Sequence, residues 1–351
     1  MRRKTLLLVA FFSALLFTGA ACGFIADTPP DGGIFASTDR GETFKQRNFV
    51  AQQGEDVVTL NFTNIFDIVF HPVDPDIIYA PSLGAGIYKT LDGGKQWTKT
   101  GLARGSYGRL IIDRVTPSTL YATNNRSILK SVDAGENWSE VYIETRSDQS
   151  ITDLALDPQT PGRVIATTST GGVLVSSDFA GTWDVQQWIS RGIAKIFYHP
   201  TNSDTFYLLT TDHHLLRTRD GGERFADLNE NWEEIVQGRV KLYDLVFRES
   251  APDLLYLATS YGILKSIDSG DSWVLQNTLV KSKTVAIKHI GLHPSDPLTM
   301  YFVAGRTLHR SFDGGEEWAV RSIPTSREIT SFRLHPSDPN SLFFGTQLIK
   351  K

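Results

Sequence analysis

Two adjacent histidines lie beside an aspartate in the segment TDHH, residues 211–214. An imidazole can act as a general base or as a metal ligand, and a neighbouring carboxylate can assist either role. One acid, Asp212, is near in sequence, whereas a metal site needs several ligands that converge. We therefore expect His213 and His214 to belong to a binding surface, and we expect no catalytic residue, metal or cofactor.

Seven aspartates recur in one pattern, with Ser or Thr two positions earlier, Gly two positions later and Trp or Phe five positions later. A calcium loop needs several acids at alternating positions, and each copy has one central Asp. The carboxylate is suited to accept hydrogen bonds from the N–H groups of a tight turn, and the Gly allows a positive φ. Ala180 takes the Gly position in one copy. We call these copies boxes and predict a structural role for their aspartates, which are Asp39, Asp92, Asp133, Asp178, Asp220, Asp268 and Asp313.

The boxes lie 41 to 53 residues apart, about the length of one four-stranded propeller blade. Alternating apolar segments such as 153–156 precede them with the period of a strand, and Pro-containing turns such as HPSDP (293–297) follow these segments. The chain ends at LFFGTQLIKK (342–351), two strands into a blade, while residues 33–39 supply a third strand and a box. We predict an all-β, seven-bladed propeller of four-stranded antiparallel blades, closed by N-terminal strands that complete the C-terminal blade.

The repeated pattern resembles the Asp-box, or BNR, repeat over residues 31–351. That repeat occurs in bacterial sialidases, xyloglucan-specific glycosidases, the sortilin ectodomain and photosystem II stability/assembly factors. The resemblance implies a propeller, and it leaves function open because these families do unrelated things. It points to a non-enzymatic scaffold that binds a protein partner in the cell envelope, or a glycan.

A glycoside hydrolase or glycan-binding protein is the alternative. The Arg-Ile-Pro segment of sialidases is absent, and the segment 70–94 is similar to the first blade of xyloglucanases. Where those enzymes carry a catalytic Asp, this chain has Leu83. Glycoside hydrolysis needs two carboxylates flanking the bond, so the loss of one weakens the enzyme interpretation.

The first 21 residues have the composition of a signal peptide, with three basic residues followed by the apolar stretch 5–18. Cys22 is the single cysteine, and its position resembles the lipidation site of bacterial lipoproteins, although Gly19 departs from that motif. We expect a signal peptide at 1–21, a linker at 22–30 and one propeller at 31–351. Lipidation, ordinary cleavage and an uncleaved anchor stay open, and each places the propeller outside the cytoplasm. We favour a lipid anchor on a bacterial membrane.

Without residues 1–21 the chain has 39 acids and 32 bases, and no long basic run, which argues against nucleic acid. The boxes and Pro-containing turns share one rim of a propeller, the box rim. The connections between blades and the loops between second and third strands share the other, the variable rim. Aromatic and Arg side chains there suit protein docking or glycan stacking, although Trp188 and Trp232 can instead plug their own loops. The candidate binding residues are Arg104, Tyr107, Asn124, Arg126, Trp188, Arg191, His213, His214, Trp232, Tyr261 and Arg306.

Overall fold

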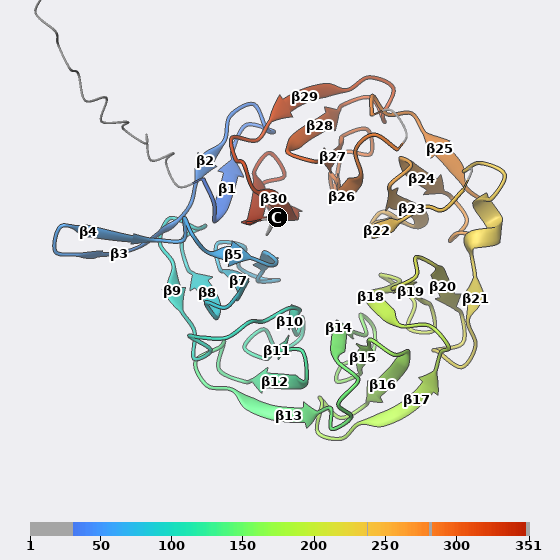
Figure 1. Ribbon diagram of the computed structural model, residues 1–351, viewed down its shortest axis with the longest axis horizontal. Helices are drawn as coiled ribbons and strands as arrows, with labels where there is room; N and C mark the ends of the chain where they lie inside the picture. The colour runs from blue at the N-terminus through green and yellow to red at the C-terminus, as the bar shows by residue number, and fades with distance from the viewer. Residues whose placement is uncertain (1–30, 237, 281–282, 349–351) are drawn as a thin grey trace, which may run out of the picture.

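The computed structural model describes residues 31–236, 238–280 and 283–348, and in this part of the chain seven β-sheets surround a central axis (Figure 1). Each sheet is one blade, with its first strand at the axis and its last at the periphery. This arrangement confirms the predicted all-β, seven-bladed propeller of four-stranded antiparallel blades.

The blades follow one another along the chain. In blade 1 the innermost strand is divided into β5 (Asn64–Ile65) and β6 (Val69–Phe70), which both pair with β7 (Ile78–Leu83), and β8 (Ile87–Thr90) and β9 (Thr98–Lys99) follow. Blade 2 contains β10 (Leu110–Ile112), β11 (Leu120–Thr123), β12 (Ser127–Ser131) and β13 (Ser139–Ile143). Blade 3 contains β14 (Ile151–Leu156), β15 (Val164–Thr168), β16 (Gly172–Ser176) and β17 (Asp184–Trp188). Blade 4 contains β18 (Ile193–Tyr198), β19 (Phe206–Thr210), β20 (Leu215–Thr218) and β21 (Ala226–Asp227). Blade 5 contains β22 (Leu242–Arg248), β23 (Ala251–Thr259), β24 (Ile263–Ser266) and β25 (Val274–Gln276). Blade 6 contains β26 (Ile287–Leu292), β27 (Met300–Ala304), β28 (Thr307–Ser311) and β29 (Ala319–Ser322).

Blade 7 closes the ring with both ends of the chain, as predicted. It contains β30 (Glu328–Leu334), β31 (Leu342–Gln347), β1 (Ile34–Ser37) and β2 (Lys45–Gln46). Strand β1 pairs antiparallel with β31, from Ile34 opposite Gly345 to Ser37 opposite Leu342. The apolar side chains of β1 are buried. The closure therefore buries the strand edges that an open ring would expose.

A belt of charged residues on the innermost strands joins neighbouring blades around the axis. Arg109 lies 3.7 Å from Asp67 of blade 1 and 3.2 Å from Asp153 of blade 3, and Lys195 lies 3.6 Å from Asp244 of blade 5. Burial raises the pKa of Asp153. Burial also acts to raise the pKa of Asp67, but Arg333 and Arg109 outweigh it and hold that pKa below its usual value. The belt thus pairs aspartates that are largely buried with bases that are partly exposed.

Every box closes its turn with the same hydrogen bonds. The Ser or Thr hydroxyl donates to the box Asp at 2.7–2.8 Å in all seven. The Asp also accepts from the N–H four positions later, at 2.8–3.1 Å. Gly222 adopts a φ of +105°, and a Cβ there would lie 2.9 Å from the ring of Phe206. Ala180, the residue that replaces Gly in one box, adopts a φ of +67°.

Each box is also bonded to the turn between the first and second strands of its own blade. The N–H of the residue after the box Asp donates to a carbonyl of that turn at 2.8–3.0 Å, as from Gly93 to Asp76 and from Ala134 to Ser118. The same bond occurs in all seven blades. The box rim is therefore one layer of turns joined by repeated hydrogen bonds.

A hairpin that the repeat did not predict projects from the ring between β2 and blade 1 (Figure 1). It consists of β3 (Phe49–Gln53) and β4 (Asp56–Thr59). The carbonyl of Phe49 accepts from the N–H of Trp97, 2.9 Å away, so the base of the hairpin is fixed to the box of blade 1. The insertion explains why Asp39 and Asp92 are 53 residues apart, the longest of the intervals.

The predicted leader at 1–21, Cys22 and the linker at 22–30 lie outside the described residues and stay predictions. Within the part that is described, no helix has the length and apolar character needed to cross a membrane. The helix η1 (Asn229–Trp232) is a single 3-10 turn in the connection between blades 4 and 5.

Candidate functional site on the variable rim

The predicted binding residues are spread over several blades rather than gathered at one point. Four of them, Arg191, His213, His214 and Trp232, lie near the junction of blades 4 and 5. The others occur singly or in pairs around the ring. The structure does not test their role in binding, which stays a prediction, but it shows what each side chain contacts.

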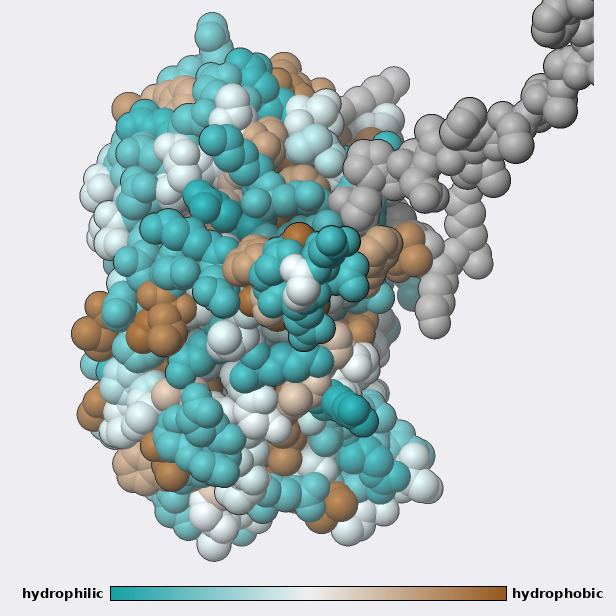
Figure 2. Space-filling model, turned by 90° about the vertical axis from the view of Figure 1, so that its left-hand side faces the viewer, coloured by the Kyte–Doolittle hydropathy of each residue, from teal (hydrophilic) through white to brown (hydrophobic). Residues whose placement is uncertain are grey.

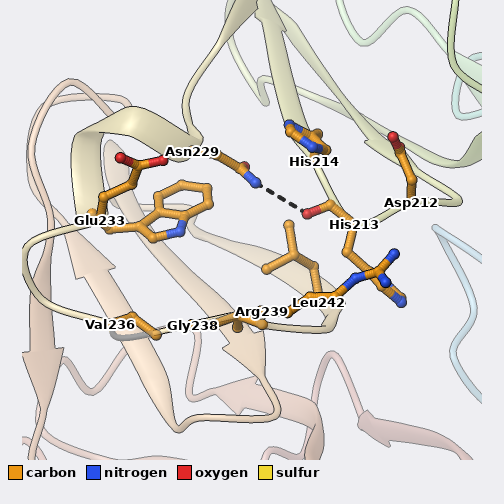
Figure 3. Close-up of a pocket in the computed structure, with 11 residues that line it drawn as sticks. Asp212, His213, His214, Asn229, Glu233, Val236, Gly238, Arg239 and Leu242 are labelled. Atoms are coloured by element: carbon orange, nitrogen blue, oxygen red, sulfur yellow. Dashed lines mark hydrogen bonds between the residues drawn. The ribbon is translucent and has the colours of Figure 1, made fainter.

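A cavity of about 280 Å³ lies at the junction of blades 4 and 5 (Figure 3). The loop before β20, the connection from blade 4 to blade 5 and the first residue of β22 form its walls. Asp212 and Glu233 lie at opposite ends of the cavity in Figure 3. The lining residues are Asp212, His213, His214, Asn229, Trp232, Glu233, Val236, Gly238, Arg239, Val240 and Leu242.

The loop 211–214 is held by a hydrogen-bond pattern like that of a box. The hydroxyl of Thr210 donates to Asp212 at 2.5 Å and accepts from the N–H of His214 at 2.8 Å. His213 adopts a φ of +70°, which a residue other than Gly adopts when its surroundings impose it. The other Asp212 oxygen is bound by the guanidinium of Arg191. The loop is therefore fixed before any ligand arrives.

A second pair of contacts fixes His214 against the wall of the cavity. Its Nδ1 lies 2.6 Å from Asp227, and Asp227 also accepts from the N–H of Asn229 at 3.1 Å. The side chain of Asn229 donates to the carbonyl of His213 at 3.2 Å and accepts from the N–H of Leu215 at 3.0 Å. Asn229 thus joins the connection between blades to the loop of blade 4.

Burial and neighbouring charges set the protonation of this loop. Partial burial acts to raise the pKa of Asp212, but hydrogen bonds from Thr210 and Arg191 outweigh it and keep the pKa below its ordinary value. Burial lowers the pKa of His213, and Lys241 and Arg239 lower it further. Asp212 is therefore an anion and His213 is neutral near pH 7. The Nδ1 atom of His213 is buried and has no hydrogen-bond partner among the described residues.

The two candidate tryptophans occupy different environments. Trp232 is 4% exposed and packs edge to face on Trp273, with ring centroids 5.4 Å apart. Trp188 is 43% exposed, and the guanidinium of Arg146 lies 4.5 Å from the centre of its ring. Trp232 therefore plugs its own connection, whereas Trp188 presents an aromatic surface to solvent.

The candidate arginines at the loops between second and third strands bind neighbouring connections. Arg126 donates to the carbonyl of Glu144 at 3.1 Å through Nε, and Arg306 donates to the carbonyl of Thr325 at 3.1 Å. Each guanidinium thereby fastens the connection that leads to the next blade. If Arg126 or Arg306 bound a partner, it would have to use the guanidinium N–H groups that these contacts do not occupy.

The remaining candidates differ in exposure. Arg104 is exposed, whereas Tyr107 is buried in the core between blades 1 and 2, where burial raises its pKa. Asn124 accepts from the N–H of Ser127 at 2.9 Å and closes its loop. Tyr261 lines a second cavity of about 330 Å³ with the outer strand of blade 5. These four positions do not share one site.

Sequence reasoning missed Asn229 and Arg239, which line the cavity, and Asp227, which holds His214 beside it. Asp227 ends a short outer strand, and its contact with His214 depends on strand pairing that the sequence does not show. The sequence contained one signal. Among the connections between successive blades that hold no extra hairpin, the one that includes residues 226–239 is the longest. An unusually long connection can cover a neighbouring loop and form a cavity with it.

The arrangement of acids does not resemble a glycosidase pair. Such a pair needs one carboxyl whose pKa is raised and one that stays ionised, both facing the substrate. Among the described carboxyls with a perturbed pKa, that of Asp153 is raised, and Asp153 lies in the axial belt. The position of the xyloglucanase Asp is occupied by Leu83 at the end of β7. The described residues contain no group of three His, Cys, Asp or Glu that could hold a metal ion.

Comparison with curated proteins and family models gives weak sequence similarity. No family model matches the chain. Sortilin from Rattus norvegicus and from Mus musculus is each 21% identical over 256 residues, which is 66% of this chain and 30% of sortilin. The chain thus spans less than a third of the length of the curated relatives that it matches.

Solved structures share the fold over most of the chain. A GH74 xyloglucanase from Xanthomonas campestris aligns with a TM-score of 0.65 at 16% identity, over 85% of this chain and 52% of the enzyme. YCF48 from Cyanidioschyzon merolae aligns with a TM-score of 0.62 at 14% identity, over 81% of this chain and 96% of YCF48. A structure of YCF48 bound to D1 peptide aligns with a TM-score of 0.63 at 16% identity, over 81% and 94% of the two chains. The chain is thus a seven-bladed propeller with weak sequence similarity to sortilin and with the fold of a xyloglucanase and of YCF48.

Proposed function

We propose that the chain is an extracytoplasmic, membrane-anchored propeller that binds a protein partner and acts as a non-enzymatic scaffold. The partner docks on the variable rim, around the cavity between blades 4 and 5. Exposed side chains at the cavity edge, such as Glu233 and Arg239, make the first contacts with it.

The observation that carries this proposal is that two acids in or beside the cavity, Asp212 and Asp227, already have protein partners. Asp212 is held by Arg191 and Thr210, and Asp227 is held by His214 and Asn229. The lowered pKa of Asp212 makes it a poor proton donor for a leaving group. A rigid rim with pre-formed polar contacts and an exposed aromatic side chain suits recognition, because little side-chain freedom is lost on binding.

The extent of the structural likeness supports the same proposal. YCF48, which has been observed with D1 peptide, is covered almost completely by this chain, whereas the xyloglucanase is covered over about half of its length. A single propeller is therefore enough for peptide binding in one neighbour. The enzyme has a second half that this chain does not match.

The proposal is tested by photo-cross-linking in the native envelope followed by identification of the captured protein. The double variant Glu233→Ala, Arg239→Ala changes exposed residues of the cavity and should lose the partner while its melting temperature stays unchanged. The control variant Gln52→Ala, Asp56→Ala changes exposed residues of the hairpin and should capture the partner like the parent. Equal capture of the partner by both variants would show that the docking site lies away from the cavity.

The alternative function is glycoside hydrolysis or glycan binding. It is favoured by one observation, that two acids, Asp212 and Glu233, line the same cavity from opposite ends (Figure 3). Turnover of xyloglucan or another β-glucan, abolished by Glu233→Gln, would establish an enzyme and overturn the scaffold proposal. Glycan binding without turnover would keep the site and change the class of ligand.

The membrane anchor rests on Cys22 and gives the variable rim an orientation. Asp31 is bonded to the connection between blades 6 and 7, where its carbonyl accepts from Thr325 at 2.6 Å. A linker of nine residues reaches at most about 30 Å, so a lipid on Cys22 would place the variable rim close to the membrane. Incorporation of radioactive palmitate, lost in Cys22→Ser, would establish the anchor. An unlabelled, released protein would indicate ordinary secretion.

A further inference from the structure

The box rim carries exposed apolar side chains at repeated positions. The residue before the box Asp is Leu91, Val132 or Ile267 in three blades, and these side chains are 66%, 65% and 72% exposed. The turns between first and second strands add Val73 and Val115, which are 74% and 71% exposed. Leu298, Phe312 and Phe179 extend the same rim, with exposures of 53%, 45% and 44%.

These side chains lie on one face of the ring, in the boxes and turns of several blades, and we call them the apolar arc. The bond from each box to its own turn places Leu91 beside the Val73 turn and Val132 beside the Val115 turn. In blade 6 the side chain of Leu298 would lie 3.5 Å from a Cβ added to Gly314, two residues after Phe312 in the chain. The arc therefore runs from blade 6 past blade 7 to blades 1, 2 and 3, with Ile267 in blade 5. Figure 2, which views the ring from its edge, shows apolar side chains among hydrophilic ones along the left-hand margin.

The same rim is strongly acidic. The seven boxes and the seven turns bonded to them contain 22 Asp and Glu and 7 Lys and Arg. The third strands carry five further bases, and four of them donate to carbonyls of the boxes, as when Lys130 donates to the carbonyl of Phe179 at 2.7 Å. With all five counted, the acids still number 22 against 12 bases. In the rest of the described chain, acids and bases are nearly balanced, at 16 and 17. The excess negative charge of the propeller is thus concentrated on the face that carries the apolar arc.

We propose that the box rim is a second docking surface, for a protein segment in which Lys or Arg side chains alternate with apolar ones. The apolar arc supplies contacts that gain from removal of water, and the surrounding carboxylates supply electrostatic complementarity. The negative charge of the box rim argues against two other occupants of this surface. A second copy would bring two acidic faces together, and an anionic membrane surface would repel the rim.

This surface is independent of the cavity on the variable rim. A propeller with one docking surface on each rim can hold two partners at once, which is what an assembly scaffold has to do. The inference goes beyond the proposed function, because the box rim could bind a basic partner whatever the variable rim binds.

The test measures binding of a fluorescein-labelled amphipathic peptide of Lys and Leu to the full chain by anisotropy. In the box-rim variant Val73→Ser, Leu91→Ser, Val132→Ser, Ile267→Ser we expect the peptide Kd to rise by at least about tenfold. The matched control Val57→Ser, Phe62→Ser, Val185→Ser, Val274→Ser changes four exposed apolar residues outside this rim and should leave the Kd unchanged. Peptides of Lys and Ser, or of Glu and Leu, should bind more weakly than the Lys and Leu peptide.

Each other outcome overturns the inference. The box rim would not be a docking surface if the box-rim and control variants lost peptide binding equally, if the box-rim variant lost none, or if the peptide did not bind the parent. Concentration-dependent dimerisation of the parent that the box-rim variant abolishes would assign the arc to a second copy, and binding to phosphatidylglycerol vesicles that the variant abolishes would assign it to a membrane. The variant Glu233→Ala, Arg239→Ala should bind the peptide normally. Loss of the peptide there would place it on the variable rim, which leaves the proposed function standing and the inference overturned.

Discussion

The two rims of the propeller use the same kinds of residue in opposite ways. On the box rim, seven aspartates make the same bonds in seven blades. On the variable rim, Asp212 and Asp227 bind partners found once in the ring, Arg191 and His214. The box rim is stabilised by the same hydrogen bonds within each backbone turn, whereas the variable rim is held by contacts between individual side chains. Substitutions should therefore affect mainly stability in the box interior and mainly recognition at exposed positions.

Removal of the closing strands should have the largest effect. Deleting residues 31–46 removes β1 and β2 and exposes the paired edge of β31. Burial of Ile34 and Phe35 alone contributes about 1.5–3 kcal/mol each, a large part of the stability of a typical protein. We expect loss of the cooperative thermal transition, or aggregation, measured by circular dichroism and light scattering.

The exposed hairpin provides the matched control for that deletion. Replacing residues 52–57 by two glycines removes exposed strand ends and should leave the transition nearly unchanged. Coincident melting of the 31–46 deletion and the parent would show that the blade does not need its N-terminal strands.

The box aromatic Trp273 should have the next largest effect. It is 4% exposed, donates to the carbonyl of Gly270 at 3.0 Å and packs on Trp232. Trp273→Ala should lower the free energy of unfolding by about 3–5 kcal/mol, as expected for a large buried side chain. Urea denaturation of the parent, both single variants and the double variant with Trp232→Ala should give a coupling of about 0.5–1.5 kcal/mol. Simple additivity would mean that the two rings contribute independently.

Acid should weaken the box rim in a defined pH range. The N–H of Asn137 and the Asn137 side chain lower the pKa of Asp133 to about 2, and the N–H of Thr182 and its side chain do the same for Asp178. Because the folded pKa lies below the unfolded value of about 3.9, this stabilisation is complete above pH 4 and is lost as the pH falls toward 2. We expect the urea midpoint to fall over that range.

The variant Asp133→Asn isolates one box from the others. Asn keeps a side-chain oxygen acceptor but has no proton to gain, so the decline of the urea midpoint between pH 4 and pH 2 should be shallower than in the parent. An unchanged slope would mean that Asp133 has the same pKa in the folded and unfolded chains.

The sequence was enough to predict the box rim because each box depends on residues close in the chain, and to predict the closure because the repeat shows which strand of a blade is missing. Ser, Asp and Gly at fixed offsets determine a turn, and a missing third strand at one end matches a spare one at the other. The variable rim depends on contacts between blades. The approach of Asp227 to His214, the burial of Trp232 and the place of Arg239 follow from how the connection 228–241 folds over blade 4, which no local pattern specifies.

Two features of the sequence indicated parts of the structure that the repeat pattern alone did not predict. The charges of Asp67, Arg109, Asp153, Lys195 and Asp244 alternate at one position of the repeat, and the structure shows that they face each other around the axis. The 53-residue interval between the first two boxes contained the extra hairpin. Periodicity in charge and departures from a repeat length therefore carry structural information beyond the repeat itself.

The contrast between a recognition residue and a structural residue is clearest for two tryptophans of the variable rim, Trp188 and Trp232. Trp188 contacts the guanidinium of Arg146 and is 43% exposed, so Trp188→Ala removes a contact worth about 0.5–1 kcal/mol and little buried area. We expect its unfolding midpoint to stay close to that of the parent while capture of the envelope partner falls. Trp232→Ala should show the reverse order of effects, a large loss of stability because the ring is buried, with capture retained at temperatures where the chain is folded. If Trp188→Ala captured the partner normally and folded Trp232→Ala did not, recognition would depend on the packing between blades 4 and 5, and the exposed aromatic surface would have no part in it.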